Sequence, residues 1–346
     1  MADFDFNCPI PPCPPDTEAR TAALIEALEE RILVMDGSTG VFLQGQDLTA
    51  EDFGGPDLEG CNENLCRTRP DVIDRLHEGY LAAGADIVET NTFGSTPLVL
   101  AEYGLEKDAY ELSRIAAVLA RTACARHDKP GRPRFVCGDL GPTTKAISVT
   151  GGVTFADLQE HFRVQALGMM AGGADYLLLE TCQDTRNIKA GLIGIERGFE
   201  QAGWRIPVAV SVTIETNGTM LAGQDAEALA VSLLHADLLY VGLNCATGPE
   251  LMRDHLRTLS EISRTTSPSS PTPDCPTKTA NTARGRRFSK RSSAITSSRA
   301  GSTWSAAAAA PRRRTSPRWR GSRRASAFAR CPIPSAVSSR ASRRSS

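Results

Sequence analysis

The 346-residue sequence lacks the features of a membrane or secreted protein. No apolar run is long enough to cross a bilayer, which requires about 20 consecutive apolar residues. Residues 1–17 are acidic and proline-rich, so they do not form a signal peptide, and we expect a flexible leader there. The ten cysteines are scattered and several lie within apolar runs, which is typical of reduced thiols in a cytoplasmic protein rather than of a disulfide framework.

The chain also lacks a large net charge, because two oppositely charged parts cancel. Residues 265–346 contain 18 lysines and arginines and one acidic residue, whereas residues 1–264 contain 21 basic and 39 acidic residues. The tail is rich in Ser, Arg, Pro and Ala and shows no helical or strand periodicity, so we expect it to be disordered. By itself such a tail would bind polyanions without sequence specificity.

Residues 18–264 alternate between short, almost continuously apolar strands and amphipathic helices. Alternation of this kind predicts a parallel sheet covered by helices, and no G-x-G-x-x-G follows a strand, which disfavours a dinucleotide-binding sheet. The spacing fits a TIM-type (β/α)8 barrel with about six βα units present and two missing. We expect the strands at residues 32–35, 86–92, 134–140, 175–182, 207–214 and 238–243.

Polar residues gather where these strands end, and in a barrel the carboxyl ends of the strands share one face. Several carboxylates and a thiol favour a site that captures a cation, which is a metal ion, a substrate ammonium group or both. The backbone N–H groups of the turn after Asp36 would suit a small anion, although an ordinary Asx turn has the same sequence. The residues at the strand ends are Asp36, Glu89, Asn91, Asp139, Glu180, Asn244 and Cys245.

Four motifs carry a resemblance to a known family, and they occur in the family's order. They are ILVMDGSTG (32–40), GADIVETNTFGST (84–96), GGADYLLLETCQDT (172–185) and VGLNCATGP (241–249). Over residues 31–264 the chain resembles the homocysteine-binding domain of cobalamin-dependent methionine synthase. More broadly, it is similar to the zinc homocysteine S-methyltransferases, which include betaine–homocysteine methyltransferase.

The resemblance implies a TIM-type barrel that activates homocysteine as a zinc thiolate, so that methyl transfer to the sulfur gives methionine. It implies that Cys245 binds zinc and that Asn244 shapes the metal site. The turn of Asp36, Gly37 and Ser38 would hold the homocysteine carboxylate, and Glu180 together with Asp36 would recognise the amino group. In the family, two further zinc ligands are adjacent cysteines of a Gly-Gly-Cys-Cys-Gly-Thr motif in the eighth strand.

The methyl donor in the family is methylcobalamin, betaine or S-methylmethionine. The segments ETNTF and DLGPT look most like the cobalamin-dependent branch. Methylcobalamin would then be carried by a separate domain or chain, with cobalamin- and folate-binding domains on other polypeptides. The resemblance implies homocysteine as the small-molecule partner, no specific nucleic acid and no membrane.

The Gly-Gly-Cys-Cys-Gly-Thr motif is absent, and the family pattern ends near Arg264. Alanine codons read from the preceding third base become Gly, Ser, Cys or Arg codons, so residues 305–311 can be re-read as that motif. Residues 266–284 re-read in the same frame resemble the family's seventh strand and the loop after it. We therefore infer a frame shift close to residues 264–266, which removes two barrel strands and two zinc ligands and leaves Cys182 as the only plausible local substitute.

Three interpretations follow from this break in the pattern. By descent the chain is a homocysteine S-methyltransferase module. The alternative from another class is an inactive truncated barrel, non-enzymatic, whose basic tail binds polyanions non-specifically. A weaker third interpretation is a different barrel enzyme that uses the carboxylates alone.

Overall fold

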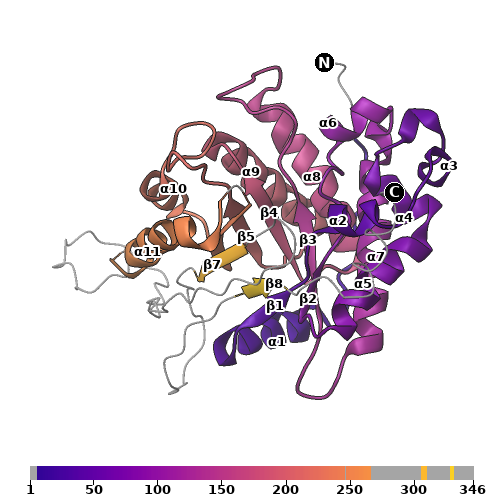
Figure 1. The fold of residues 1–346 in the computed structure, drawn as a ribbon, viewed down its shortest axis with the longest axis horizontal. Coiled ribbons are helices and arrows are strands. Elements are labelled where there is room, and N and C mark those ends of the chain that lie inside the picture. The colour runs from indigo at the N-terminus through magenta and orange to yellow at the C-terminus, as the bar shows by residue number, and fades with distance from the viewer. Residues whose placement is uncertain (1–5, 246, 266–304, 310–327, 331–346) are drawn as a thin grey trace, which may run out of the picture.

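The computed structural model describes residues 6–245, 247–265, 305–309 and 328–330, and its centre is a curled parallel sheet surrounded by helices (Figure 1). Six strands follow one another across the sheet in sequence order, and each pairs in parallel with the next. This confirms the strand–helix alternation expected from the sequence. The six strands are β1 (Leu33–Met35), β2 (Ile87–Glu89), β3 (Phe135–Leu140), β4 (Tyr176–Cys182), β5 (Val208–Val212) and β6 (Tyr240–Asn244).

The helices begin and end at residues suited to those positions. Thr154 and Asp157 form a capping box at the start of α8, and Gly173, with φ of 91°, ends that helix in the left-handed region. Asp184 caps α9, whose C-cap is Gly203. The α-helices are α1 (Thr17–Glu30), α2 (Thr39–Gln44), α3 (Ala50–Phe53), α4 (Leu65–Thr68), α5 (Pro70–Ala82), α6 (Pro97–Leu100), α7 (Ala109–His127), α8 (Phe155–Gly172), α9 (Thr185–Ala202), α10 (Ala226–Leu233) and α11 (Pro249–Thr265). None of the helices in the described part of the chain is long and apolar enough to cross a membrane.

The two faces of the sheet bury different side chains. On the outer face, residues such as Val136, Leu177 and Val210 join apolar residues of the surrounding helices in one large cluster. The inner face forms a separate cluster that also takes in Leu24 and Leu28 of α1, which lies close to β1 (Figure 1). The strand residues of this inner cluster are Leu33, Met35, Ile87, Phe135, Cys137, Tyr176, Leu178, Ala209 and Tyr240.

Two Gly-Ala-Asp motifs place a buried aspartate before β2 and before β4, at the amino end of the sheet. Asp86 forms an ion pair with Arg31 at 2.6 Å, and Asp175 forms one with Arg20 at 2.6 Å. Each carboxylate also accepts a backbone N–H from the neighbouring strand. The repeated motif therefore joins strands to the surrounding chain at the end of the barrel opposite the predicted site.

Two short segments of the basic tail extend the sheet. β7 (Ser305–Ala309) pairs with β6 in antiparallel orientation, and β8 (Phe328–Arg330) pairs with β1 in parallel. The antiparallel pairing of β7 differs from the all-parallel order of a (β/α)8 barrel. The expectation of a disordered tail also differs from the structure at these two segments, and otherwise it falls on residues outside the described part of the chain.

The leader is held against the outer helices from Phe6 onward. The Arg163 guanidinium donates to the Phe6 carbonyl at 2.9 Å, and the Trp204 indole N–H donates to the Pro11 carbonyl at 2.9 Å. Cys8, between these two contacts, is buried. The structure thus anchors residues of the leader that the sequence led us to expect to be flexible.

Candidate active site at the carboxyl ends of the strands

A layer of buried polar side chains lies on the inner face of the sheet, at the carboxyl ends of the strands. Every second residue of a strand points to the same face. Because Ile87, Phe135, Tyr176, Ala209 and Tyr240 belong to the inner cluster, residues two or four positions further along also face inward. These residues are Glu89, Asp139, Glu180, Ser211 and Asn244, and none is more than 7 % exposed.

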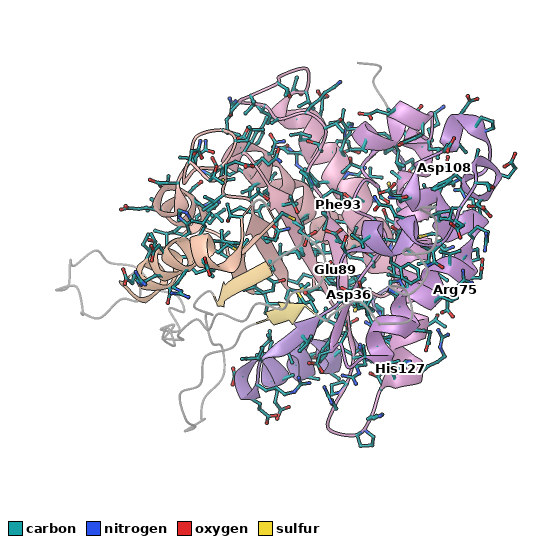
Figure 2. The ribbon with its side chains drawn as sticks, in the orientation of Figure 1. Asp36, Arg75, Glu89, Phe93, Asp108 and His127 are labelled. Atoms are coloured by element: carbon teal, nitrogen blue, oxygen red, sulfur yellow. The ribbon has the colours of Figure 1, made fainter. Side chains whose placement is uncertain are left out.

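Asp36 directly follows β1 and connects it to β2. Both of its carboxylate oxygens accept the backbone N–H of Glu89, each at 3.1 Å, and Asp36 and Glu89 lie close together at the sheet in Figure 2. Arg75 and Asp108, in contrast, lie on the helical side of the molecule in that view. Asp36 therefore fixes the relative position of two strand ends, in addition to the amino-group recognition that the family resemblance implies.

The turn after Asp36 is tightly packed. A Cβ atom added to Gly37 would lie 2.7 Å from the hydroxyl oxygen of Tyr80, which is fully buried. The Ser38 hydroxyl accepts the Val41 N–H at 3.4 Å and so caps α2. Glycine is required at position 37 because Tyr80 occupies the space of a side chain, and the Ser38 hydroxyl is used by the helix.

A set of hydroxyl and amide contacts that the sequence did not reveal links β2 to β3. The Thr92 hydroxyl donates to the Asp139 carbonyl at 2.6 Å, and the Asp139 N–H donates to the Thr90 hydroxyl oxygen at 3.0 Å. The Gln165 amide, fully buried on α8, donates to the Thr92 carbonyl at 2.7 Å. The only sequence signal for these contacts is the run of polar residues at the end of an otherwise apolar strand.

Glu180 is buried near the end of β4, where the strand is irregular. The pairing of β4 with β5 shifts register between Leu179 and Cys182, which marks a bulge. Within it Thr181 has a φ of 55°, in the left-handed region that β-branched residues rarely adopt. Bulges commonly re-aim side chains next to active sites, and this one lies directly beside Glu180.

Asn244 and Cys245 end β6 and begin the connection to α11. The Asn244 side-chain amide donates to the Thr181 hydroxyl oxygen at 2.6 Å and to the Cys245 sulfur at 3.4 Å. The Ser211 hydroxyl of β5 donates to the Asn244 side-chain oxygen at 3.3 Å. Since β1 to β6 are parallel, Cys245 lies at the same edge of the sheet as Asp36 and Glu180.

The described residues do not fit a catalytic zinc ion, which normally needs three protein ligands. In the described ranges, no three His, Cys, Asp or Glu side chains gather to hold a metal ion. Cys182 is a poor substitute for a missing cysteine ligand, because burial raises the pKa of its thiol well above the usual range. Cys275 and Cys331 of the tail lie outside the described residues.

The parallel sheet, its surrounding helices and the polar layer at the carboxyl ends of its strands define a TIM-type α/β-barrel protein. The model of the homocysteine S-methyltransferase family matches residues 33–308, and the chain belongs to this family. The family assignment inferred from the four sequence motifs is thereby confirmed.

Two curated relatives are methionine synthases. Those of Mycobacterium tuberculosis and Mycobacterium leprae are each 45% identical to this chain over 243 residues, which cover 70% of the chain. The match covers only 20% of either relative, so the chain spans about a fifth of their length.

Solved structures of a homocysteine methyltransferase share the fold. The oxidized form of MmuM from Escherichia coli matches with a TM-score of 0.58 and 21% identity, over 70% of this chain and 82% of that chain. The metallated form gives the same TM-score and identity and is covered to 83%. At this level of identity the likeness concerns the fold alone.

Proposed function

We propose that the carboxyl edge of this barrel binds homocysteine as the methyl acceptor in a transfer that gives methionine. The observation that carries the proposal is the inward-facing layer of buried carboxylates on β2, β3 and β4, at the same edge of the sheet as Asn244 and Cys245. Membership of the homocysteine S-methyltransferase family and the similarity to methionine synthases support it.

The carboxylates suit the ammonium group of an amino-acid substrate. Glu180 is 5 % exposed and Asp36 is 1 % exposed, and a carboxylate so far from water interacts strongly with a cation that enters its surroundings. We assign recognition of the homocysteine amino group to Glu180 together with Asp36. The backbone N–H groups of the turn that contains Gly37 and Ser38 would hold the substrate carboxylate.

Zinc and methylcobalamin belong to the proposal for a complete module. We assign Cys245 as one zinc ligand and Asn244 as the residue beside the metal, with the other two ligands in the segment that the frame shift replaces. We propose methylcobalamin, on a separate domain or chain, as the methyl donor. A cytoplasmic location is part of the same proposal, and the described cysteines, which are free thiols, agree with it.

Calorimetric titration of homocysteine into the frame-corrected protein and its Glu180→Gln variant tests the substrate assignment. The variant keeps the shape of the side chain but removes its charge. We expect weaker binding by about 1.5–3 kcal/mol, the range for a hydrogen bond to a charged group. Glu196→Gln, an exposed carboxylate paired with Arg205, is the matched control and should bind as the parent does. Unchanged affinity in Glu180→Gln would remove Glu180 from the site.

The rival proposal is an inactive, truncated barrel with a basic tail that binds polyanions. The incomplete ligand set favours it for the chain as printed, and zinc content distinguishes the two proposals. The printed protein should purify almost free of zinc, whereas the frame-corrected protein should hold about one zinc per chain and lose it on Cys245→Ala. Nucleotide sequence across codons 260–270 tests the frame shift itself. One tight zinc in the printed protein would refute the frame-shift account.

A further inference from the structure

Two strand ends of the candidate site have left-handed backbone at residues that are not glycine. Thr181 has a φ of 55° and directly follows Glu180, and Cys245 has a φ of 58° and directly follows Asn244. A β-branched residue at positive φ is a genuine outlier, and such strain persists only where the surrounding structure enforces it. The two outliers therefore mark the ends of β4 and β6 as places where geometry has been fixed against local preference.

A single buried amide connects the two outliers. Asn244, 1 % exposed, donates from its side-chain nitrogen to the Thr181 hydroxyl at 2.6 Å and to the Cys245 sulfur at 3.4 Å. On its other side, the Asn244 amide oxygen accepts the Ser211 hydroxyl at 3.3 Å, and its backbone carbonyl accepts the Thr213 hydroxyl at 3.3 Å. The amide thus links β4, β5 and the residues that follow β5 to the thiol at the end of β6.

The left-handed turn explains how Thr181 reaches Asn244. In a regular strand Thr181 would point to the face opposite Glu180, toward the outer helices. The bulge and the positive φ break this alternation, so that the Thr181 hydroxyl accepts a hydrogen bond from the inward-facing Asn244, two strands away in the sheet. The same turn sets the position of Glu180, because the two residues are neighbours in the bulge.

We propose that Thr181 is a positioning residue that orients the Cys245 thiol through the Asn244 amide. The assignment of Cys245 to the site rests on the proposed function, but the linkage of the three side chains does not. In this arrangement the bulge in β4 fixes the substrate carboxylate at Glu180 and the sulfur at Cys245 relative to each other. A substitution at Thr181 therefore moves the thiol without touching it.

The test measures how fast iodoacetamide alkylates Cys245 at one fixed pH, with peptide mass spectrometry as the readout. Thr181→Val keeps the branched shape and removes the hydroxyl, whereas Thr181→Ser keeps the hydroxyl. With the amide loosened, the thiol swings more readily toward solvent, so Thr181→Val should raise the rate about two- to tenfold, the range that one hydrogen bond supports. Thr181→Ser should restore the parent rate.

The route through Asn244 has its own check, because effects that share one path do not add. Asn244→Ala should raise the Cys245 rate as Thr181→Val does, and the double variant should raise it no further. A rate in Thr181→Val equal to or below that of the parent overturns the proposal, and so do additive effects in the double variant.

Two other cysteines serve as internal references in the same digest. Cys13 is exposed and should react equally in every variant, and Cys137 is fully buried and should remain unlabelled in any folded variant. If Cys137 reacts in Thr181→Val, that variant has not folded, and Thr181→Ala takes its place with the same expected increase. Homocysteine titration is a separate readout, since the parent's failure to bind homocysteine would refute the proposed function and leave the alkylation result intact.

Discussion

His77 of α5 offers a quantitative test of the core, because it is a histidine in an apolar setting. The side chain is fully buried, and neither ring nitrogen has a hydrogen-bond partner among the described residues. Its neighbours in the helix include Ile73, Leu76 and Tyr80, which belong to one hydrophobic cluster. Burial lowers the pKa of His77 to about 4, because a charged imidazolium is disfavoured away from water.

The lowered pKa makes stability depend on pH in a defined direction. The unfolded chain takes up the proton near the ordinary histidine pKa of about 6.5, whereas the folded protein resists protonation until about pH 4. Since the unfolded state binds more protons between these values, the free energy of unfolding falls as pH decreases from 6.5 toward 4. At 1.36 kcal/mol per pKa unit, His77 alone removes about 2 kcal/mol between pH 7.5 and about pH 5.

Urea unfolding followed by circular dichroism, at pH 7.5 and at about pH 5, measures this contribution. The His77→Leu variant fills the same apolar site without a titrating group, so it should lose about 2 kcal/mol less than the parent over this interval. A constant offset from the change in packing cancels in the comparison. His235→Leu, at an exposed position, controls for the loss of an imidazole and should behave as the parent does. Equal acid-induced losses in the parent and in His77→Leu would refute the burial argument.

Two further substitutions test contacts at opposite ends of the barrel. Asp175→Asn removes the buried partner of Arg20 and should destabilise the protein by about 3–5 kcal/mol, measured by urea unfolding, whereas Asp254→Asn, in an exposed pair, should change stability little. A loss below 1 kcal/mol in Asp175→Asn would contradict the proposed role. Gly37→Ala should lower stability by about 1–3 kcal/mol because its Cβ meets the Tyr80 hydroxyl, and adding Tyr80→Phe should recover part of the loss. No recovery in the double variant would show that the hydroxyl is not the obstacle.

The regular part of the barrel could be predicted from sequence because its signals are local. The expected strand at 134–140 compares with Phe135–Leu140, and the expected strand at 175–182 compares with Tyr176–Cys182. Apolar runs, small residues at helix ends and capping side chains each act within a few residues, so they define these bounds. Parallel order then places every strand end that follows β1 to β6 at one edge of the sheet.

The connections within the site could not be predicted, because they depend on residues from different strands. The motif around Glu180 shows a carboxylate at a strand end, but the positive φ of Thr181 and its bond to Asn244 exist only once β4 and β6 are folded together. Asp36 was expected to face the substrate, and the sequence gave no sign that it also accepts the Glu89 N–H. Ser211 could have been noticed as a hydroxyl that alternates with apolar residues in β5, on the inward-facing side.

The tail shows why a frame shift separates the fold of this barrel from its chemistry. Backbone N–H and C=O groups are the same in every residue except proline, so almost any segment can pair with the edge of β6, and Ser305–Ala309 does so. Its antiparallel direction brings Ser305 opposite Asn244, at the edge where Cys245 lies. A zinc site, however, requires particular side chains, and this segment is serine followed by alanines. The strand that borders the thiol therefore extends the sheet without supplying the ligands that the family places in its eighth strand.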